Sequence, residues 1–573
     1  MNDIQQSRRR WHVLTILCIG LFMLLLDGTI VNIAIPSIMA DFRAGFSQVE
    51  WVMNAYLLVF AVLLITMGRL GDLYGRKRLF VIGTAVFTLA SLACGLAPSI
   101  GALIAFRAAQ GFGGAMMMPN TLSIIAHVFS ARERGTAMGI WGGVTGVATA
   151  VGPTLGGVLV QVASWPYIFW INVPVGIAVI FLAVRVIPES SDPASHQQID
   201  WAGVFVLSGS LFCLTFALIE GQNYGWTSPT ILGLFAAAAL GLVAFIFIER
   251  RQREPLMELS LFRSRVFSVG NICGACLTFG MMGVLFLLPI FLQSILGYSA
   301  IKTGLTLTPL AAVVIFAAPL SGWLSDRIGS RWLVSAGMLV LAGGFALIRS
   351  VMSLDADWSS FVIPFMISGI GIGMVMAPLT SVVMASAPLG KAGQASGVLS
   401  TMRQLGSVLG IAVMGAVLQN RAVVYLEQAV SAKLSAVSYI PAEAKTKIAS
   451  SVGATMKNMG EMSAGGGMGK PPAAVTDMIA QVPAAMVEQA KAFFAELFNR
   501  TLILGEFVRA MQTTLLVSMV VLVCGSALAA LFLRSHVAPA EGREETTLGE
   551  GGPSGMDTRQ RLGDGGLAAE EGA

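Results

Sequence analysis

Charged side chains lie inside otherwise apolar stretches of this chain at three places. Asp27 lies in GLFMLLLDGTIVNIAIP (residues 20–36), Arg107 begins RAAQGFGGAMMMP, and Arg403 lies in a third apolar stretch. In a membrane such a charge costs about 2.5–3.5 kcal/mol on insertion scales, and intramembrane charges commonly mark ion or substrate pathways. A carboxyl shielded from water is pushed towards its neutral form, so it can take up and release a proton. Asp27 is therefore predicted to carry protons.

Proton binding at Asp27 would compete with the binding of a substrate. The bare carboxylate attracts a cation and the protonated one does not, and competition of this kind is sufficient for antiport. In the structural alternative, Asp27 is permanently protonated or hydrogen-bonded to Thr29 or Asn32, and serves helix packing. Arg107 has its own alternative, a side chain that reaches back to the membrane surface.

The residue types that carry out catalysis in enzymes are scattered along this chain. His12, His127, His196 and His536 do not cluster, the six Cys lie in apolar runs, and no G-x-x-x-x-G-K-[ST] loop is present. Metal sites, nucleophile triads and ATP binding each need such clusters or loops. We expect no enzyme activity, no metal and no cofactor, so that a proton gradient supplies the energy.

The composition predicts that membrane-spanning helices position these charges. Hydrophobic residues make up 55% of the 573 residues and charged residues only 12%, against roughly 25% charged residues in ordinary soluble domains. The basic residues form short scattered clusters, so no nucleic-acid binding is expected. Fourteen apolar runs are long enough to cross a bilayer. They lie near 12–35, 48–68, 79–97, 101–124, 136–160, 167–187, 201–221, 229–249, 266–293, 303–324, 332–350, 361–384, 396–419 and 511–533.

Basic residues in the connections predict the orientation of the spans. The short connections on one side carry only Arg43, Lys302 and Arg349, and most of the other Lys and Arg fall on the opposite side. Because cytoplasmic connections are normally the basic ones, both termini are predicted to be cytoplasmic.

Two segments lie outside the array of spans. Residues 420–510 are predicted to form a long outer loop, with helix-favouring stretches at 421–434 and 473–498. Residues 535–573 are rich in Gly and Glu with almost no aromatic residues, which predicts a disordered cytoplasmic tail.

An internal repeat divides the chain into two halves. GRLGDLYGRKR at 68–78 matches GWLSDRIGSRW at 322–332, and RGTAMGI at 134–140 matches AGQASGV at 392–398 at nearly the same separation. Two independent matches at one separation indicate homologous halves. Parallel repeats around a central site are one of the known plans of transporters, so a transporter is predicted.

Several motifs resemble those of the major facilitator superfamily and its drug:proton antiporters. GRLGDLYGRKRLF resembles the signature loop of the superfamily, and LDGTIVNIAIP and GVATAVGPTLGGVL resemble antiporter motifs. SWPYIFWINVPVG and the fourteen runs resemble the fourteen-span branch of multidrug exporters. The resemblance implies an all-α membrane protein with the major facilitator fold, in which two six-helix bundles rock about a central cavity and a two-helix hairpin is inserted between them. The implied parts are 1–187 (N-terminal bundle), 188–260 (hairpin and linkers), 261–534 (C-terminal bundle with the loop 420–510) and 535–573 (tail).

The signature loop implies a gate. Its glycines allow a tight turn and a close approach of helices, and its Asp beside basic residues can form a charge network that breaks and reforms as the halves move. The alternative is simple anchoring by positive charge. The implied gating residues are Gly68, Asp72, Gly75, Arg76, Arg78, Asp326 and Arg327.

The antiporter motif in the fifth span implies a seal between the halves. Small residues let helices touch and a proline kinks the span, although a packing face without any role in antiport would use the same residues. The motif residues are Gly146, Gly152, Pro153, Gly156 and Gly157. The resemblance also places Arg107 with Asp27 in the proton pathway.

The absence of further acidic residues from the predicted spans indicates the class of substrate. Relatives that handle divalent cations carry further acidic residues in spans 2, 10 and 13, where this chain has Asn54 and no Asp or Glu within 303–324 or 396–419. Glu220 and Glu506 are expected in water, which leaves Asp27 as the one buried carboxylate and one proton per cycle. Met and Phe provide an adaptable apolar surface for varied compounds. The cavity candidates are Asn32, Asn54, Met117, Met118, Met282, Phe286 and Arg403.

These observations together predict a proton-coupled antiporter that exports small hydrophobic or monovalent cationic compounds as a monomer in the bacterial inner membrane. One alternative is an exporter of a lipid or of an endogenous amphiphilic metabolite. A second is a membrane scaffold that does not transport and docks a periplasmic partner through the loop 420–510.

Overall fold

Helices make up all the regular structure of the residues that the computed structural model describes, which are 2–44, 46–191, 200–252, 255–435 and 500–533. The predicted all-α class is therefore confirmed. The helices of the first part of the chain are α1 (Asn2–Phe42), α2 (Phe46–Tyr74), α3 (Arg76–Gly95), α4 (Ile100–Val128), α5 (Ala131–Val162), α6 (Tyr167–Trp170), α7 (Asn172–Val186), α8 (Trp201–Tyr224) and α9 (Pro229–Glu249).

The second part of the chain contributes six long helices and several short ones. The long helices are α10 (Arg265–Ile290), α11 (Ala300–Ile328), α12 (Ser330–Val351), α13 (Val362–Ala385), α14 (Ala392–Ser435) and α18 (Arg500–Phe532). Short 3₁₀ segments occur at Leu259–Arg263, Trp358–Phe361 and Leu389–Lys391, and a π-helical turn at Phe291–Ile295 extends α10.

Thirteen of the described helical stretches are long and apolar enough to cross a membrane. They agree with thirteen of the fourteen predicted spans. The remaining predicted span, 136–160, lies within α5, which is 32 residues long and at 1.5 Å per residue reaches about 48 Å.

Local sequence signals account for where several helices begin. Ser99, Ser228, Ser264 and Ser299 each accept a hydrogen bond at their side-chain oxygen from a backbone N–H three residues later, at the starts of α4, α9, α10 and α11. These serines satisfy donors that the first helical turn leaves free. Serine N-caps therefore define where these four helices begin.

The two glycines of the repeated signature loop both adopt a left-handed backbone. Gly75 has φ 108° between α2 and α3, and Gly329 has φ 85° between α11 and α12. Side chains rarely adopt such angles, which explains why glycine occupies both positions. The tight turn predicted at Gly75 is thus present in each half.

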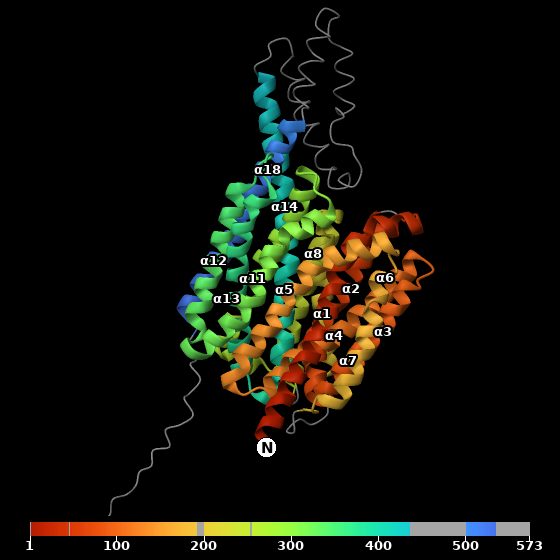
Figure 1. The fold of residues 1–573 in the computed structure, drawn as a ribbon, viewed down its shortest axis with the longest axis vertical. Coiled ribbons are helices and arrows are strands. Elements are labelled where there is room, and N and C mark those ends of the chain that lie inside the picture. Colours follow the sequence, from red (N-terminus) through yellow and green to blue (C-terminus); the bar gives the residue numbers. More distant parts are fainter. Residues whose placement is uncertain (1, 45, 192–199, 253–254, 436–499, 534–573) are drawn as a thin grey trace, which may run out of the picture. The chain divides into compact units, whose positions relative to one another are not determined.

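The helices of the two halves lie side by side (Figure 1). Helix α5 of the first half packs along α11 of the second, and α2 packs along α14. Helices α8 and α9 pack against each other, and α8 also contacts α2 and α14. We call the end of this bundle that carries the N-terminus, Gly75 and Gly329 the motif end, and the opposite end the far end.

Helices occupy both ends of the segment predicted as the loop 420–510. The helix-favouring stretch predicted at 421–434 is confirmed, since α14 continues to Ser435, and α18 begins at Arg500. The continuation of α14 buries a stripe of apolar residues spaced four apart, and α14 packs along α18 there. The residues of the stripe are Ala422, Leu426, Val430 and Leu434. The predicted helical stretch 473–498 and the tail 535–573 lie outside the described residues.

Candidate functional site

Asp27 on α1 is fully buried and forms a salt bridge with Arg107 on α4. Nη1 of Arg107 lies 2.5 Å from Oδ2 of Asp27, and the side chains of Arg107 and Asp27 are 1% and 0% exposed. A buried carboxylate and a buried guanidinium compensate each other's charge, whereas either one alone would be costly. The two charges singled out in the sequence therefore form one site.

Two amides complete the hydrogen bonding of the Asp27 carboxylate. Gln110 Nε2 and Asn172 Nδ2 each donate to Oδ1 of Asp27 over 2.8 Å. Gln110 Oε1 in turn accepts a hydrogen bond of 2.7 Å from Arg107 Nη1. Carboxylate, amide and guanidinium thus form a closed ring in which the carboxylate accepts from three side chains.

Arg107 is held on its other side by α2. Its Nε donates to the carbonyl oxygen of Val52 over 3.1 Å, and its guanidinium carbon lies 4.3 Å from the centre of the Tyr56 ring. A cation over an aromatic face is attracted by the ring quadrupole. With these contacts and 1% exposure, the side chain points into the bundle and does not reach back to the membrane surface.

A serine extends the network to α3. Asn172 Nδ2 donates to Ser91 Oγ over 3.0 Å, and Ser91 Oγ donates to the carbonyl oxygen of Phe169 over 2.8 Å. The network formed by Asp27, Arg107, Gln110, Asn172 and Ser91, which we call the Asp27 network, joins α1, α3, α4 and α7. All of these helices belong to the first half of the chain.

Gln110 and Asn172 were not singled out in the sequence. Gln110 lies three residues after Arg107, on the same face of α4, and this spacing is a signal that could have identified it. Asn172 lies in the quoted stretch SWPYIFWINVPVG, between two apolar residues. Of the two predicted hydrogen-bond partners of Asp27, Thr29 donates to the carbonyl oxygen of Leu26, and the side chain of Asn32 lies outside the described part.

The glycines of the antiporter motif place α5 between α1 and α11. A side chain at Gly152 would collide with Thr29, and one at Gly156 with Ile30, so both positions touch α1 within three residues of Asp27. A side chain at Gly146 would collide with Val314 on α11. Gly157 has more room, since its nearest neighbour would be Ile301 at 3.5 Å, and the side chain of Pro153 lies outside the described part. One helix of small residues therefore connects the helix of Asp27 with the second half.

At the motif end, Asp72 on α2 binds the N-terminus of α14. Its carboxylate accepts hydrogen bonds from the backbone N–H groups of Gly393 (2.8 Å) and Gln394 (2.9 Å). It also accepts from Arg76 Nη2 over 2.8 Å, and Arg76 donates to the carbonyl oxygen of Gly390 over 3.1 Å. A carboxylate is stabilised at a helix N-terminus by the free N–H groups and the helix dipole. Gly68 permits this contact, because a side chain there would collide with Gly393.

The repeat places a second carboxylate at the corresponding position. The carboxylate of Asp326 on α11 lies against Gly135 in the second turn of α5, where an added side chain would collide with it. Gly322 lies against the backbone of Gly135, as Gly68 lies against Gly393. Each half thus presents an aspartate to the N-terminal part of a helix of the other half, and we call these contacts the Asp72 clamp and the Asp326 clamp.

Two residues assigned to the gate lie apart from these clamps. Arg78 is 74% exposed and lies 3.7 Å from Glu189, and Arg327 lies over the Trp323 ring. Arg78 lies on α3, beyond the turn at Gly75, and Arg327 directly follows Asp326 on α11 and is therefore rotated by about 100° from it. The remaining gating residues, Gly68, Asp72, Gly75, Arg76 and Asp326, lie in or beside the clamps.

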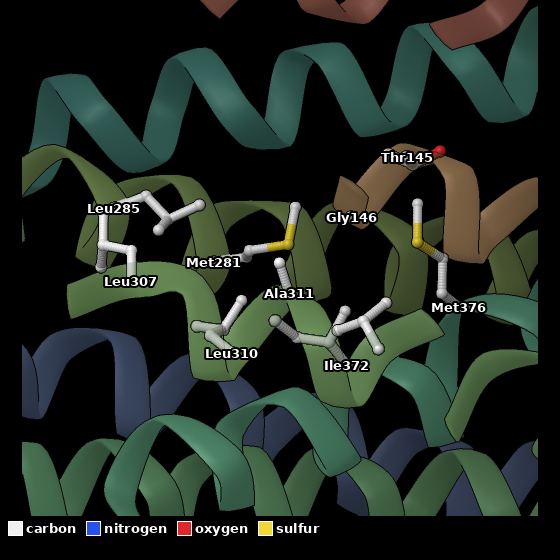
Figure 2. Close-up of a pocket in the computed structure, with 10 residues that line it drawn as sticks. Thr145, Gly146, Met281, Leu285, Leu307, Leu310, Ala311, Ile372 and Met376 are labelled. Carbon is white, nitrogen blue, oxygen red and sulfur yellow. The ribbon is translucent and has the colours of Figure 1, made fainter. Parts of the chain in front are cut away.

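An apolar cavity of about 50 Å³ lies between α5 of the first half and the helices of the second half (Figure 2). Its lining is almost entirely aliphatic or thioether, with Thr145 as the one hydroxyl. The lining residues are Thr145, Gly146, Met281, Leu285, Leu307, Leu310, Ala311, Val314, Ile372 and Met376.

The predicted cavity residues do not line this cavity. Met281 and Leu285, four apart on α10, face it, whereas the predicted Met282 and Phe286 are each one residue further and therefore rotated by about 100°. Met117 is buried inside the first half against α1 and α3, where it would contact a side chain at Gly20 or Gly83. Met118 lies beside it on α4.

The polar candidates also lie elsewhere. Asn54 is buried on α2, and Arg403 is buried on α14 with a hydrogen bond of 2.6 Å from its Nη2 to Thr380 Oγ1. The side chain of Asn32 lies outside the described part.

Asp27 is not the one buried carboxylate, as the sequence had suggested. Asp72, Asp200, Glu220 and Glu249 are also buried. Glu220 was expected in water but is 4% exposed, because α8 packs against α2 and Trp226 folds back over the last turn of α8. It accepts a hydrogen bond of 3.0 Å from Asn223 Nδ2.

Comparison with known proteins gives consistent matches. Residues 17–411 match the profile of the Major Facilitator Superfamily. The chain is 38% identical over 415 residues to the tetracenomycin C resistance and export protein of Streptomyces glaucescens, covering 72% of this chain and 77% of that protein. It is 38% identical over 414 residues to the multidrug resistance protein Stp of Mycobacterium tuberculosis, covering 71% and 76%.

A solved structure supports the fold. The human organic anion transporter MFSD10 (TETRAN) matches with a TM-score of 0.53 over 71% of this chain and 93% of that chain. The sequence identity is 17%, so this likeness concerns the fold alone.

Proposed function

This chain belongs to the major facilitator superfamily and is a multi-pass membrane transporter rather than an enzyme, and we propose that it exports hydrophobic compounds in exchange for protons. The observation that carries the proposal is the fully buried salt bridge between Asp27 and Arg107. Charges of this kind within membrane helices characterise proton relays.

The Asp27 network has two arrangements that a proton would interconvert. With Asp27 ionised, the carboxylate holds Arg107, Gln110 and Asn172 around it. A proton on Asp27 removes the negative charge, so Arg107 loses its partner and keeps only Val52, Gln110 and the Tyr56 ring. The ionised carboxylate attracts Arg107 and a protonated one does not, so proton uptake is tied to movement of Arg107 away from Asp27.

Close helix packing would transmit this change to the second half. Asp27 lies two and three residues before Thr29 and Ile30, which touch the glycines of α5, and α5 in turn packs along α11. A shift of α1 therefore moves α5, whose N-terminal part the Asp326 clamp contacts. Tightly packed elements transmit such shifts as whole-body movements because packed interiors are barely compressible.

The cavity supports hydrophobic compounds as the cargo. Its lining offers almost no polar group, and the named relatives confer resistance to, or export, antibiotics and drugs. Drug-sized ligands need about 300–1,000 Å³, so the cavity of about 50 Å³ has to widen when the halves move. A cationic compound would have to replace Arg107 at Asp27, which makes hydrophobic cargo without a positive charge the better fit.

The clamps define which side is closed. Both of them lie at the motif end, which the distribution of basic residues predicts to be cytoplasmic. On this orientation the structure closes the cytoplasmic side, and release of the clamps would open it to cargo from the cell interior. We place the transporter in the bacterial inner membrane, acting as a monomer with a proton gradient as its energy source.

Gradient-driven dye accumulation tests the proposal. Purified protein is reconstituted in vesicles with an acidic lumen, and accumulation of the hydrophobic dye Hoechst 33342 is measured with and without the gradient over a range of pH. Asp27→Asn is expected to bind the dye but to lose gradient-driven accumulation at every pH, because an amide cannot exchange a proton.

A second aspartate of α1 supplies the matched control. Asp41 is exposed and accepts a hydrogen bond from Trp165 Nε1 over 2.8 Å. Asp41→Asn should leave accumulation unchanged. Full accumulation by Asp27→Asn at all pH values would remove the basis of the proposal.

A further inference from the structure

Arg403 is a buried cation in the second half of the chain. It lies on α14, eleven residues after Ala392, which at 1.5 Å per residue is about 16 Å from the start of the helix. The hydrocarbon core of a bilayer is about 30 Å thick, so this position is near its middle. The side chain is 7% exposed.

Most of the Arg403 guanidinium lacks a hydrogen-bond partner. Nη2 donates to Thr380 Oγ1 over 2.6 Å, whereas Nε and Nη1 have no partner among the described residues. A guanidinium carries five N–H donors, and buried donors are normally satisfied. Arg107 shows the usual outcome, since its Nε and Nη1 both have acceptors.

The three helices that contribute the contacts of Arg403 described here offer no nearby carboxylate. Helices α10 and α13 contain no Asp or Glu, and the acidic residue of α14 is Glu427, 24 residues further on. At 1.5 Å per residue this separation is about 36 Å. A buried charge without a counter-charge costs several kcal/mol, so the described residues leave a site that an anion would complete.

The surroundings of Arg403 provide one further hydrogen-bond donor. Gly274 on α10 lies directly against the Arg403 side chain, since an added Cβ would be 3.6–3.8 Å from its Cγ and Nε. One turn before Arg403, the hydroxyl of Ser400 is buried and has no hydrogen-bond partner among the described residues, so it can donate to an anion. Helices α10 and α14 pack along each other there.

The geometry connects Arg403 with the apolar cavity. Thr380, its hydrogen-bond partner, donates to the carbonyl oxygen of Met376, one turn away, and Met376 lines the cavity (Figure 2). The repeat gives an independent indication. The match of 134–140 with 392–398, continued along both helices, pairs Arg403 with Thr145, and Thr145 lines the same cavity from the first half.

We propose that Arg403 binds an anionic oxygen group, a carboxylate or phenolate, of the transported compound while the apolar body of that compound fills the widened cavity. This inference rests on the proposed export function and narrows its cargo to amphiphilic organic acids. A guanidinium is suited to the task because it stays charged and donates hydrogen bonds in a plane that matches carboxylate oxygens. The apolar lining and one buried cation together fit a molecule with a single acidic group.

A matched pair of dyes tests the inference. Rhodamine 123 is a methyl ester, and rhodamine 110 is the corresponding free acid, so the two differ in one carboxylate. In the vesicle assay, Arg403→Gln is expected to lower the apparent affinity for the acid about tenfold to a hundredfold, as for loss of a hydrogen bond to a charged group. Transport of the ester should change less than twofold, and Arg403→Lys should retain part of the acid transport.

Stability separates this role from a structural one. Removing an uncompensated buried charge should leave the unfolding temperature of Arg403→Gln and Arg403→Met unchanged or raised, whereas a structural arginine would lower it. Thr380→Val, which keeps the charge, should retain most of the preference for the acid. An equal loss of acid and ester in folded Arg403→Gln would overturn the inference and leave the export proposal intact.

A direct binding measurement tests the anion site without relying on transport. Fluorescence polarisation of rhodamine 110 with the purified protein should show binding to the wild type and to Asp27→Asn, and weakened binding to Arg403→Gln. If the wild type bound the acid in this way but accumulated neither dye, the export proposal would fail while the anion site stood. Equal binding of the acid by wild type and Arg403→Gln would refute the anion site.

Discussion

Asp27 and Arg107 stabilise each other as a buried ion pair. The carboxylate has three side-chain donors, and the guanidinium is fixed between Asp27, Gln110, the Val52 carbonyl and the Tyr56 ring. Removing one partner of a buried ion pair leaves the other uncompensated, which is typically far worse than removing both. The pair therefore contributes both to the stability of the protein and to transport, and mutations can separate the two contributions.

We predict that Arg107→Gln lowers the unfolding free energy by about 3 kcal/mol, because it leaves the Asp27 carboxylate buried without its cation. The double variant Asp27→Asn with Arg107→Gln should recover most of this loss, since both members are then neutral, but it should not recover transport. Thermal unfolding in detergent measures the first effect and vesicle accumulation the second. Equal stability of the single and double variants would show that the pair is not coupled.

The sequence identified the charged residues Asp27 and Arg107 but not the neutral amides that bind them. Asp27 and Arg107 stand out because a charge in an apolar stretch is rare, and neutral amides such as Gln110 and Asn172 carry no comparable signal. Which side chains meet depends on how α1, α4 and α7 are rotated about their axes. The cavity residues show the same limit, because Met281 and Met282 differ by one residue and face directions about 100° apart.

Helix α5 shows how small residues act at the scale of an element. Its glycines contact α1 at Thr29 and Ile30 and α11 at Val314, so it forms part of the interface between the halves. The Asp27 network itself lies entirely within the first half. Any effect of a proton on the second half therefore passes through contacts such as these.

We predict that Gly152→Ala strongly impairs transport, because the added Cβ collides with Thr29 and forces α1 and α5 apart. Combining it with Thr29→Gly removes the colliding side chain and should restore a large part of the activity. Gly157→Ala is the matched control, because its Cβ would make only an ordinary contact of 3.5 Å with Ile301. Loss of transport in Gly157→Ala equal to that in Gly152→Ala would argue against the specific contact with α1.

The continuity of α14 was only partly foreseen at the level of elements. The sequence predicted a helical stretch at 421–434 but assigned it to a loop, because the apolar run ends near residue 419. The structure joins this stretch to the span as one helix, and Tyr425 contacts Thr513 and Arg509 of α18 there. Packing between two segments far apart in the sequence cannot be read from the hydropathy of one of them.

The two halves meet at the motif end through two corresponding aspartates. Asp72 binds the N-terminus of α14, and the carboxylate of Asp326 lies against Gly135 of α5. The repeat in the sequence predicted two halves with matching motifs. It could not predict which state they adopt, because the open and closed states use the same helices and differ only in the contacts between the halves.

We predict that Asp72→Asn shifts the closed-to-open equilibrium about tenfold to a hundredfold towards the state that is open at the motif end, since it weakens hydrogen bonds to a charged group. Asp326→Asn should have a similar effect, and the double variant a larger one. Double electron–electron resonance between spin labels at positions 78 and 388, in a background without native cysteines, should show a growing population at longer distance.

An aspartate at the far end provides the comparison for this experiment. Asp355 is exposed, so Asp355→Asn should leave the distance distribution unchanged. An Asp72→Asn protein with the wild-type distribution would show that the clamp does not hold the halves together.

The continuity of α14 has a practical consequence. The helix runs unbroken for 44 residues from the Asp72 clamp to Ser435 and extends past the other described helices at the far end (Figure 1). A ligand such as an antibody fragment that binds residues 421–435 would hold one end of a rigid helix whose other end has to move when the halves separate at the motif end. On the orientation that the basic residues predict, such a ligand would block the transporter from outside the cell, without crossing the membrane or competing with cargo.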